Sequence, residues 1–261
     1  MNKPTKQIEF SIQNHVALIA INRPEKLNAI SREMMILLDN ALSEIDQNRS
    51  IRAVILHSRA PRAFGVGADI NDWASLPPLE MWRYWVRRGH RVIRSLEELL
   101  QPVIAVTNGY TFGGSLELAL AADLRIAEEN SQYAFPEVTV GTIPGWMGTQ
   151  KGLQLIGPGK LKKMIFTGQA ISAREACAIG LVDEVVPENE GLKHALELAE
   201  QICQSSPVAV SLAKQVVNSL AASPSVTALE SIASGLAAQS ADGEEGKASF
   251  KEKRKPSFTG S

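Results

Sequence analysis

Short apolar runs with the character of β-strands alternate with helical patterns along the first three-quarters of this chain. Strands are expected at residues 8–12, 15–21, 53–57 and 123–129, and a strand followed by a turn at 102–109. Helices are expected from Ser31 to about residue 45 and at 79–100, 112–123 and 171–180. From about residue 190 the pattern is almost entirely helical, with breaks at Pro207 and Pro224. The alternation predicts an α/β fold followed by a helical region.

Capping residues mark two of the expected helices. Ser31 can cap the first of them. Its expected apolar side holds Met34, Leu38, Ala41, Leu42 and Ile45. Ser172 and Glu175 have the spacing of a capping box, and Gly180 is placed to end the same helix.

Composition narrows the function classes. The 261 residues carry 27 Lys and Arg against 28 Asp and Glu, so no excess of positive charge favours nucleic acid or an anionic membrane. The two cysteines and four histidines form neither a disulfide framework nor a zinc motif. The first ten residues lack the apolar core of a signal peptide, and no apolar run is long enough to span a membrane. We therefore expect a cytoplasmic protein without a bound metal.

Two turns contain paired glycines. In "NGYTFGGSLELALAAD", Gly113 and Gly114 open a helix that carries Glu117 among apolar residues. In "RAFGVGADI", Gly65 and Gly67 precede Ala68 and Asp69. Each could be only a tight turn with a capping acid, and neither matches a Walker loop. Alternatively, glycine lets a ligand approach the backbone N–H groups closely.

One carboxylate stands alone in "SQYAFPEVTVGTIPG", a segment that otherwise indicates buried or tightly turned chain. This residue, Glu137, needs a salt bridge, a raised pKa or a catalytic role, because an unpaired buried carboxylate is costly. Backbone donors at the glycine turns could stabilise an enolate, and Glu117 with Glu137 could divide general acid and base duties. Together these features favour proton chemistry next to a carbonyl group.

The sequence resembles the enoyl-CoA hydratase (crotonase) family over nearly its whole length. The resemblance is carried, in order, by "RPEKLNAIS", "FGVGADI", "PVIAVTNGYTFGGSLELALAAD", "FPEVTVGTIPG", "GTQ", "TGQAISAREACAIGLVDEVV" and "FKEKRKPSF". It implies a spiral of strand–strand–helix units with a C-terminal helical trimerisation region. The implied domains are an acyl-CoA-binding core, 1–195, and a helical region, 196–261, that completes the CoA site and the contacts of a trimer or a dimer of trimers.

The resemblance also implies a chemistry: reversible hydration of a trans-2-enoyl-CoA to a 3-hydroxyacyl-CoA, with no cofactor beyond the CoA thioester substrate. The N–H groups of Ala68 and Gly114 would form an oxyanion hole. Glu137 would exchange a proton with C2, and Glu117 would activate water at C3. Implied substrate-binding residues are Lys26, Leu27, Val66, Asp69, Ile70, Trp146, Phe250 and Lys253. Phe250 and Lys253 would contact CoA bound mainly to a neighbouring subunit.

Some positions depart from the family pattern. Ser115 replaces the last glycine of a Gly-Gly-Gly run and should tighten the neighbourhood of the oxyanion hole. Trp146 and Met147 replace small residues, and they would either line the acyl pocket or pack in the core or a trimer contact. Other reactions on this scaffold remain alternatives: isomerisation, decarboxylation or dehalogenation. A non-catalytic or RNA-binding relative is a further alternative, and the intact pair of glutamates argues against it. The presence of both glutamates favours hydration, because isomerisation needs only one base.

The expected helix at 79–100 has two distinct sides. Its apolar side would hold Trp82, Trp85, Val86, Val92, Ile93 and Leu96. Trp82 and Trp85 are expected in the core or in the wall of the acyl pocket. Its basic side would hold Arg83, Arg87, Arg91 and Arg94. Some relatives bind RNA, but the near-neutral charge favours a solvated face, and no nucleic acid partner is expected.

Overall fold

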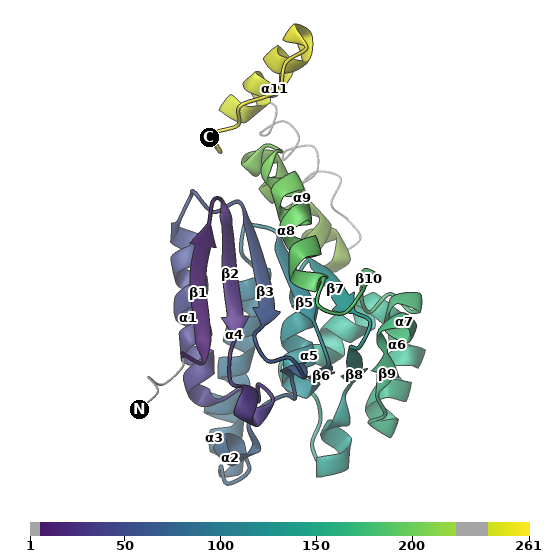
Figure 1. Ribbon diagram of the computed structural model, residues 1–261. Coiled ribbons are helices and arrows are strands. Elements are labelled where there is room, and N and C mark those ends of the chain that lie inside the picture. Colours follow the sequence, from purple (N-terminus) through teal and green to yellow (C-terminus); the bar gives the residue numbers. More distant parts are fainter. Residues whose placement is uncertain (1–5, 223–239) are drawn as a thin grey trace.

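A computed structural model describes residues 6–222 and 240–261 and contains two sheets (Figure 1). The larger sheet has the order β1-β2-β3-β5-β7-β10, and the smaller has the order β4-β6-β8-β9. The larger sheet contains β1 Ile8–Gln13, β2 Val16–Ile21, β3 Ala53–Ser58, β5 Val103–Thr107, β7 Leu124–Glu128 and β10 Glu184–Val186. The smaller contains β4 Ala63–Gly65, β6 Tyr110–Phe112, β8 Gln132–Ala134 and β9 Ile171–Ser172. The α/β prediction and all five predicted strand segments are confirmed.

The two sheets are built from a repeated unit. Each of three successive units contributes its first strand (β3, β5, β7) to the larger sheet and its second (β4, β6, β8) to the smaller. A helical segment follows each pair of strands. Neighbouring units pair in parallel, β3 with β5 and β5 with β7, and likewise β4 with β6 and β6 with β8. The chain therefore advances as a spiral in which each unit pairs with the next in both sheets.

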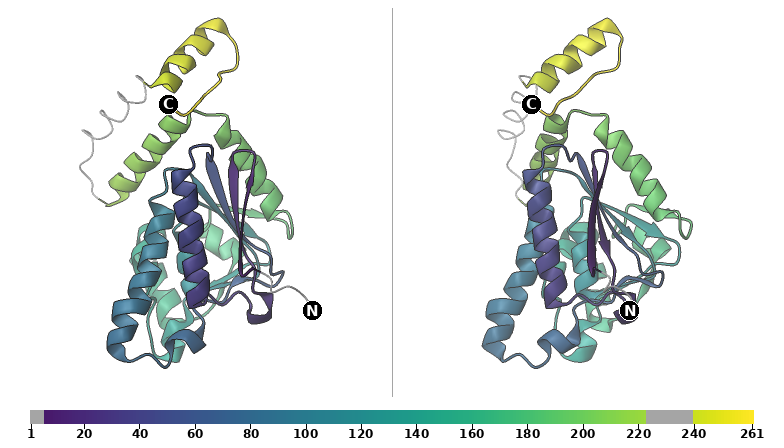
Figure 2. Two further views of the ribbon diagram at one scale, coloured as in Figure 1. Left: turned by 90° about the vertical axis from the view of Figure 1, so that its left-hand side faces the viewer. Right: turned by 60° about the vertical axis from the view of Figure 1, so that its left-hand side comes forward.

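Helices cover both faces of the larger sheet. Helices α1, Arg32–Gln47, and α4, Arg87–Glu97, lie side by side on one face, and α8, Gly191–Cys203, lies on the other (Figure 2). The predicted cap of α1 is confirmed, because the Ser31 hydroxyl accepts a hydrogen bond from the N–H of Met34. All five residues predicted for the apolar side of α1 are buried. The 3.6-residue spacing of its apolar residues therefore predicts correctly which side of α1 faces the core.

Helix α5, Gly113–Leu120, lies at the centre of the molecule. All eight of its residues are buried, including Glu117, so it is surrounded by protein and not amphipathic. It packs against α6, Gly148–Thr167, which contains a kink at Gly157. Helix α7, Ala173–Ala178, begins with the predicted capping box, and Gly180 follows its end with a positive φ of 85°.

The predicted single helix at 79–100 is wrong in one respect. It is divided into α3, Pro78–Glu80, a π-helical turn, Met81–Val86, and α4. A π-turn bonds i to i+5, so residues three apart no longer share a face. Trp85 is buried, but Trp82 is 62% exposed, which contradicts its expected place in the core or pocket wall. The predicted basic residues Arg83, Arg87, Arg91 and Arg94 form an exposed face, as expected.

The glycine turn at 62–70 also contains regular structure. Its first part is β4, and its last residue begins helix α2, Ile70–Trp73. Asp69 caps α2 by accepting a hydrogen bond from the N–H of Asn71 at 3.0 Å. The sequence does not indicate strand β4, because its three residues are too few to show the alternation of a β-strand.

The C-terminal region consists of α9, Pro207–Ala222, and α11, Ala241–Glu252, among the described residues. It is tied to the body by Arg52, which donates to the carbonyl oxygen of Phe258 at 2.7 Å. The predicted break at Pro207 is confirmed, because α8 ends at Cys203 and α9 begins at Pro207, whereas Pro224 lies outside the described residues. The predicted domain boundary at residue 195 falls inside α8. None of the described helices is both long and apolar enough to span a membrane.

Candidate active site

A cavity of about 220 Å³ lies beside the N-terminus of α5. Its walls come from the loop 66–70, from Trp73, from the π-helical turn, and from the segment 136–146. Both Glu117 and Glu137 line it, although they come from different units of the spiral. Among the described residues, no ionisable side chain other than these two carboxyl groups lines the cavity. The fold therefore places two acids in one apolar chamber.

Glycines let the backbone segments at the cavity approach one another closely. Gly67 has a φ of 101° and Gly113 a φ of 50°, which residues with a Cβ rarely adopt. A Cβ atom on Gly113 would lie 2.8 Å from Oε1 of Glu137. Hence Glu137 can contact the start of α5 only because this residue is glycine.

The two N–H groups predicted for the oxyanion hole lie on adjoining segments. A Cβ atom on Gly114 would be 3.4 Å from the nitrogen of Ala68. Gly114 is the second residue of α5, where backbone N–H groups have no partner within the helix. On either side of Ala68, Gly67 donates to the Ser115 hydroxyl at 3.0 Å and Asp69 donates to a carbonyl oxygen at 2.9 Å. Ser115 thus holds the loop that presents Ala68.

Glu117 is anchored by backbone donors. Its side chain comes from α5, and its Oε1 accepts from the N–H groups of Trp146 at 2.8 Å and Gly148 at 2.7 Å. The residue is only 2% exposed, and this burial raises the pKa of Glu117 to about 7. The N–H donors oppose that shift, whereas the charge of Glu137 adds to it. Glu117 can therefore gain or lose a proton near neutral pH.

Glu137 lies in a short 3₁₀ helix, Pro136–Val140, that Pro136 begins and Gly141 ends in the left-handed region. Burial is the main cause that raises the pKa of Glu137 to about 7. Its Oε2 is buried and accepts no hydrogen bond from any group in residues 6–222 and 240–261. Of the three possibilities for this residue, the structure provides the raised pKa and no salt bridge within the described residues.

The raised pKa of Glu117 makes stability depend on pH. Its folded value, about 7, lies above the ordinary 4.5, so the folded protein binds this proton more tightly. The resulting stabilisation is complete below about pH 4.5 and is lost as pH rises through about 7. We expect the free energy of unfolding to fall over this window by no more than about 3 kcal/mol from Glu117.

Chemical denaturation at several pH values checks this expectation. Glu117→Gln has no proton to release and should show a shallower decline over the same window. The remaining decline would come from Glu137, whose pKa is shifted in the same direction. Equal slopes for the wild type and Glu117→Gln would contradict the raised pKa.

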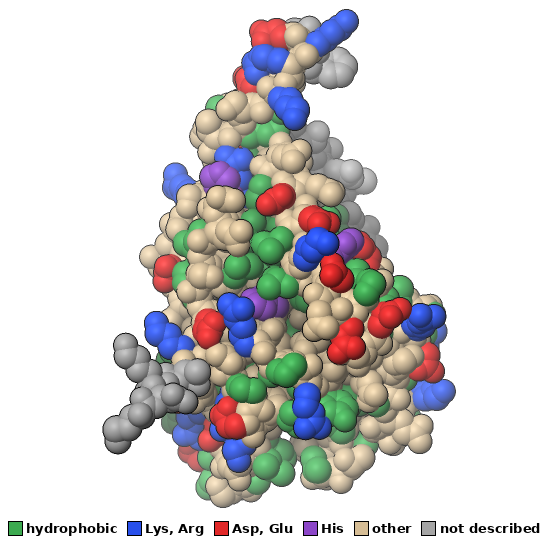
Figure 3. Space-filling model, in the orientation of Figure 1, with side chains coloured by type: hydrophobic (Ala, Val, Ile, Leu, Met, Phe, Trp, Pro, Cys, Tyr) green, Lys and Arg blue, Asp and Glu red, His purple; other side chains and the backbone are tan. Residues whose placement is uncertain are grey.

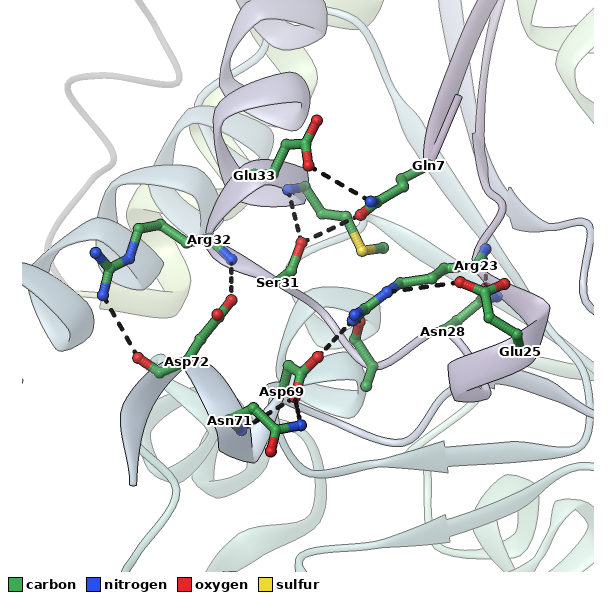
Figure 4. Close-up of polar contacts among 12 residues, drawn as sticks. Gln7, Arg23, Glu25, Asn28, Ser31, Arg32, Glu33, Asp69, Asn71 and Asp72 are labelled. Carbon is green, nitrogen blue, oxygen red and sulfur yellow. Dashed lines mark hydrogen bonds and ion pairs between the residues drawn. The ribbon is translucent and has the colours of Figure 1, made fainter. Parts of the chain in front are cut away.

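The predicted substrate-binding residues are divided between the cavity and its surroundings. Val66, Ile70 and Trp146 line the cavity, whereas Lys26 and Leu27 do not. Asp69 does not line the cavity, and its carboxylate is directed at Arg23, to which it is ion-paired at 2.6 Å (Figure 4). That pair holds the pKa of Asp69 below its ordinary value, against the effect of burial. Asp69 therefore stabilises the loop, whereas its neighbours Ala68 and Ile70 line the cavity.

The predicted C-terminal contacts lie at the other end of the molecule. Lys253 is exposed just after α11, and Figure 1 shows α11 far from α2, which lines the cavity. The side chain of Phe250 lies outside the described part of the structure. Neither residue can therefore be placed at the cavity of its own chain, and their assignment to a neighbouring subunit stays a prediction.

Several cavity residues were not predicted. Trp73 and Met81 line it, and so do Val140 and Ile143, although these two are mostly exposed. Their exposure corrects the expectation that the whole of 131–145 is buried or tightly turned. Exposed apolar side chains beside a candidate catalytic residue indicate a ligand-binding surface. Val140 and Ile143 could be recognised as cavity residues by this signal, which only the structure provides.

The electrostatics elsewhere are mixed. Acidic and basic side chains are interspersed over the face shown in Figure 3. In the described parts of the chain, no group of three His, Cys, Asp or Glu side chains is arranged to hold a metal ion.

Comparisons with known proteins agree with this architecture. The sequence profile of the enoyl-CoA hydratase/isomerase family matches residues 11–261. The short-chain-enoyl-CoA hydratase of Clostridium acetobutylicum is 39% identical, over 93% of this chain and 94% of that protein. The crotonyl-CoA hydratase of Syntrophomonas wolfei is 34% identical, over 94% and 95% of the two chains. A crystal structure of an enoyl-CoA hydratase from Bacillus anthracis superimposes with a TM-score of 0.94 at 37% identity, covering 98% of this chain and 100% of that one.

The fold is thus the crotonase fold, and the strand–strand–helix spiral expected from the sequence is confirmed. The profile match and the two hydratases at 34% and 39% identity each extend over more than nine-tenths of the chain. This protein belongs to the enoyl-CoA hydratase/isomerase family.

Proposed function

We propose that this protein catalyses the reversible addition of water to a trans-2-enoyl-CoA, giving a 3-hydroxyacyl-CoA. The observation that carries the proposal is the pair Glu117 and Glu137, two carboxyl groups on one apolar cavity with pKa values raised to about 7. Groups that titrate near the working pH are the most effective general acids and bases. The named hydratases among the relatives support the same reaction.

The thioester carbonyl is polarised by backbone donors. Its oxygen accepts from the N–H groups of Ala68 and Gly114, which also stabilise the enolate that forms during addition. The dipole of α5 points its positive end at the same oxygen. The Ser115 hydroxyl holds the Ala68 loop, so the donors need little rearrangement as charge develops.

The two acids then divide the elements of water. Glu117, held through Oε1, uses its carboxylate to take a proton from water as the oxygen bonds to C3. Glu137 delivers a proton to C2. The water oxygen forms the C3–O bond with its own lone pair, and the π pair of the C2–C3 bond moves through the enolate into the new C2–H bond. Hydration therefore starts with Glu117 ionised and Glu137 protonated, and the reverse reaction starts with the opposite pair of states.

The remaining requirements are few. Acyl-CoA is the only small molecule in the reaction besides water, so no cofactor is proposed. The C-terminal region assembles a homotrimer, or two trimers paired as a hexamer, in which Phe250 and Lys253 reach CoA on a neighbouring subunit. The distance of α11 from the cavity of its own chain supports that arrangement (Figure 1). A cytoplasmic location stays part of the proposal.

Lys253 provides a test of the neighbouring-subunit contact. Lys253→Ala should raise KM for acyl-CoA more than it lowers kcat, because a remote phosphate contact stabilises bound substrate and transition state alike. Lys255→Ala, another exposed lysine of the tail, is the matched control and should change neither. Steady-state kinetics at several ionic strengths measures both variants. A fall in kcat at constant KM would assign Lys253 to folding or assembly instead.

The reaction type is tested by product analysis. Wild-type protein is incubated with trans-2- and trans-3-enoyl-CoA substrates, and the products are separated by liquid chromatography, which distinguishes the double-bond isomers, and identified by mass spectrometry. Hydration of the 2-enoyl substrates adds the mass of one water. Conversion of 3-enoyl to 2-enoyl substrates without any hydrated product would assign the protein to isomerisation.

A further inference from the structure

The side chain of Trp146 separates two apolar spaces. One is the candidate catalytic cavity, and the other is a void of about 10 Å³ in the core. Of the residues that the structure describes, Trp146 alone lines both. The void is otherwise enclosed by core residues such as Leu38, Ile93 and Leu118. The indole therefore stands where the catalytic cavity would otherwise continue into the space between α1, α4 and α5.

Packing fixes the position of this indole. A Cβ atom on Gly89 of α4 would lie 2.0 Å from its Cδ1, and one on Gly114 of α5 would lie 2.7 Å from its Cε3. The ring of Trp85 stands 5.5 Å from it, tilted by 45°. Trp146 is 4% exposed, so the ring is held on several sides. The backbone N–H of Trp146 also donates to Glu117, so one residue both blocks this side of the cavity and positions the glutamate.

The same wall is entirely apolar. The described residues near it on the cavity side, Trp85, Val86 and Met81, carry no charge, and the only ionisable groups in the cavity are the two catalytic candidates. A carboxylate at the far end of an acyl chain would be buried there without a cation, which is costly. An uncharged acyl chain would instead gain from the apolar contact.

We propose that Trp146 is the end wall of the acyl subsite and restricts the protein to short, uncharged enoyl groups. The inference rests on the proposed function for the orientation of the substrate. Size supports it: an apolar cavity of about 150 Å³ holds a benzene molecule. The cavity here, about 220 Å³, must also hold the thioester and the reacting water. The space that remains for the acyl group is therefore small.

The test compares substrates within each variant. For wild type, kcat/KM should fall at least about tenfold from crotonyl-CoA to trans-2-decenoyl-CoA, because each misfitting methylene costs specificity. Trp146→Ala keeps the backbone N–H, joins the cavity to the void, and should raise the decenoyl-to-crotonyl ratio by about tenfold or more. Trp146→Leu, which fills more space, should raise it less. An enoyl-CoA with a terminal carboxylate should stay a poor substrate for all three proteins.

Trp82→Ala is the matched control. It removes the same side chain from an exposed position on the adjoining turn and should leave the substrate ratio unchanged. Circular dichroism and thermal melting identify a variant that fails to fold, and Trp146→Leu then decides the question. An unchanged ratio in a folded Trp146 variant overturns the proposal, as does an equal rise in Trp82→Ala.

Calorimetric binding separates this inference from the proposed reaction. Butyryl-CoA and decanoyl-CoA are saturated, so their dissociation constants do not depend on hydration. If the wild type hydrates no enoyl-CoA but Trp146→Ala still shifts the decanoyl-to-butyryl affinity ratio, the proposed function fails and the end wall stands. If the wild type hydrates crotonyl-CoA, and Trp146→Ala shifts neither the kcat/KM ratio nor the affinity ratio, the proposed function stands and only the role of Trp146 as end wall is wrong.

Discussion

Glu137→Gln should keep acyl-CoA binding and lose turnover by about 10²–10⁴-fold, the range typical of general acid–base groups. Glutamine nearly matches the shape of protonated glutamate but cannot exchange a proton with C2. In the wild type, Oε2 of Glu137 accepts no hydrogen bond within the described residues, so replacing this oxygen by an amide nitrogen breaks no hydrogen bond at that atom. Steady-state kinetics with crotonyl-CoA and calorimetric binding of butyryl-CoA measure the two effects separately.

A matched substitution shows whether the loss is specific. Glu188→Gln changes an exposed glutamate in the turn after β10 and should leave turnover unchanged. Proton exchange at C2 gives a second readout, because butyryl-CoA in D₂O should exchange a C2 proton with the wild type and not with Glu137→Gln. Near-normal hydration by Glu137→Gln would remove this residue from the mechanism.

Glu117→Gln should also lose about 10²–10⁴-fold in turnover, but for a different reason. The N–H groups of Trp146 and Gly148 both donate to Oε1, so the glutamine oxygen is expected to face them and the amide NH₂ to face the cavity. An NH₂ group cannot take a proton from water. The fold of the segment from Trp146 to Gly148 should therefore survive while the base is lost.

The two variants should differ in one measurable respect. With Glu137 intact, Glu117→Gln should still exchange the C2 proton of butyryl-CoA in D₂O, although it no longer hydrates crotonyl-CoA. Loss of exchange in both variants would show that the two carboxyl groups act as one unit. Retention of hydration in Glu117→Gln would assign the activation of water to another group.

The sequence predicts elements whose signals are local. Helix α1 has a sustained apolar period and a capping serine, and α7 has a complete capping box, so both are found correctly. The smaller sheet escapes prediction because its strands have only two or three residues and form by pairing between distant segments. Trp82 is misplaced because a π-turn shifts the register without leaving any sign in the apolar pattern.

The candidate site likewise has features that the sequence shows and features that only tertiary contacts create. The unusual surroundings of Glu117 and Glu137 are visible in the sequence, since a lone acid among apolar residues is rare. Their shared cavity, and the two N–H groups that hold Glu117, depend on the contact between α5 and the start of α6. Similarly, the pairing of Asp69 with Arg23 joins segments far apart in the chain, so sequence alone could not distinguish a structural acid from a ligand.

In the proposed mechanism, Glu117 directs water to C3 while Glu137 directs a proton to C2 of the same substrate. The most direct measurement is a hydration of crotonyl-CoA in D₂O enriched in ¹⁸O, followed by mass and NMR analysis of the product. We expect one ¹⁸O at C3 and one deuterium at C2, delivered to the same face of the double bond. Deuterium at C2 without oxygen at C3, or addition to opposite faces, would contradict it.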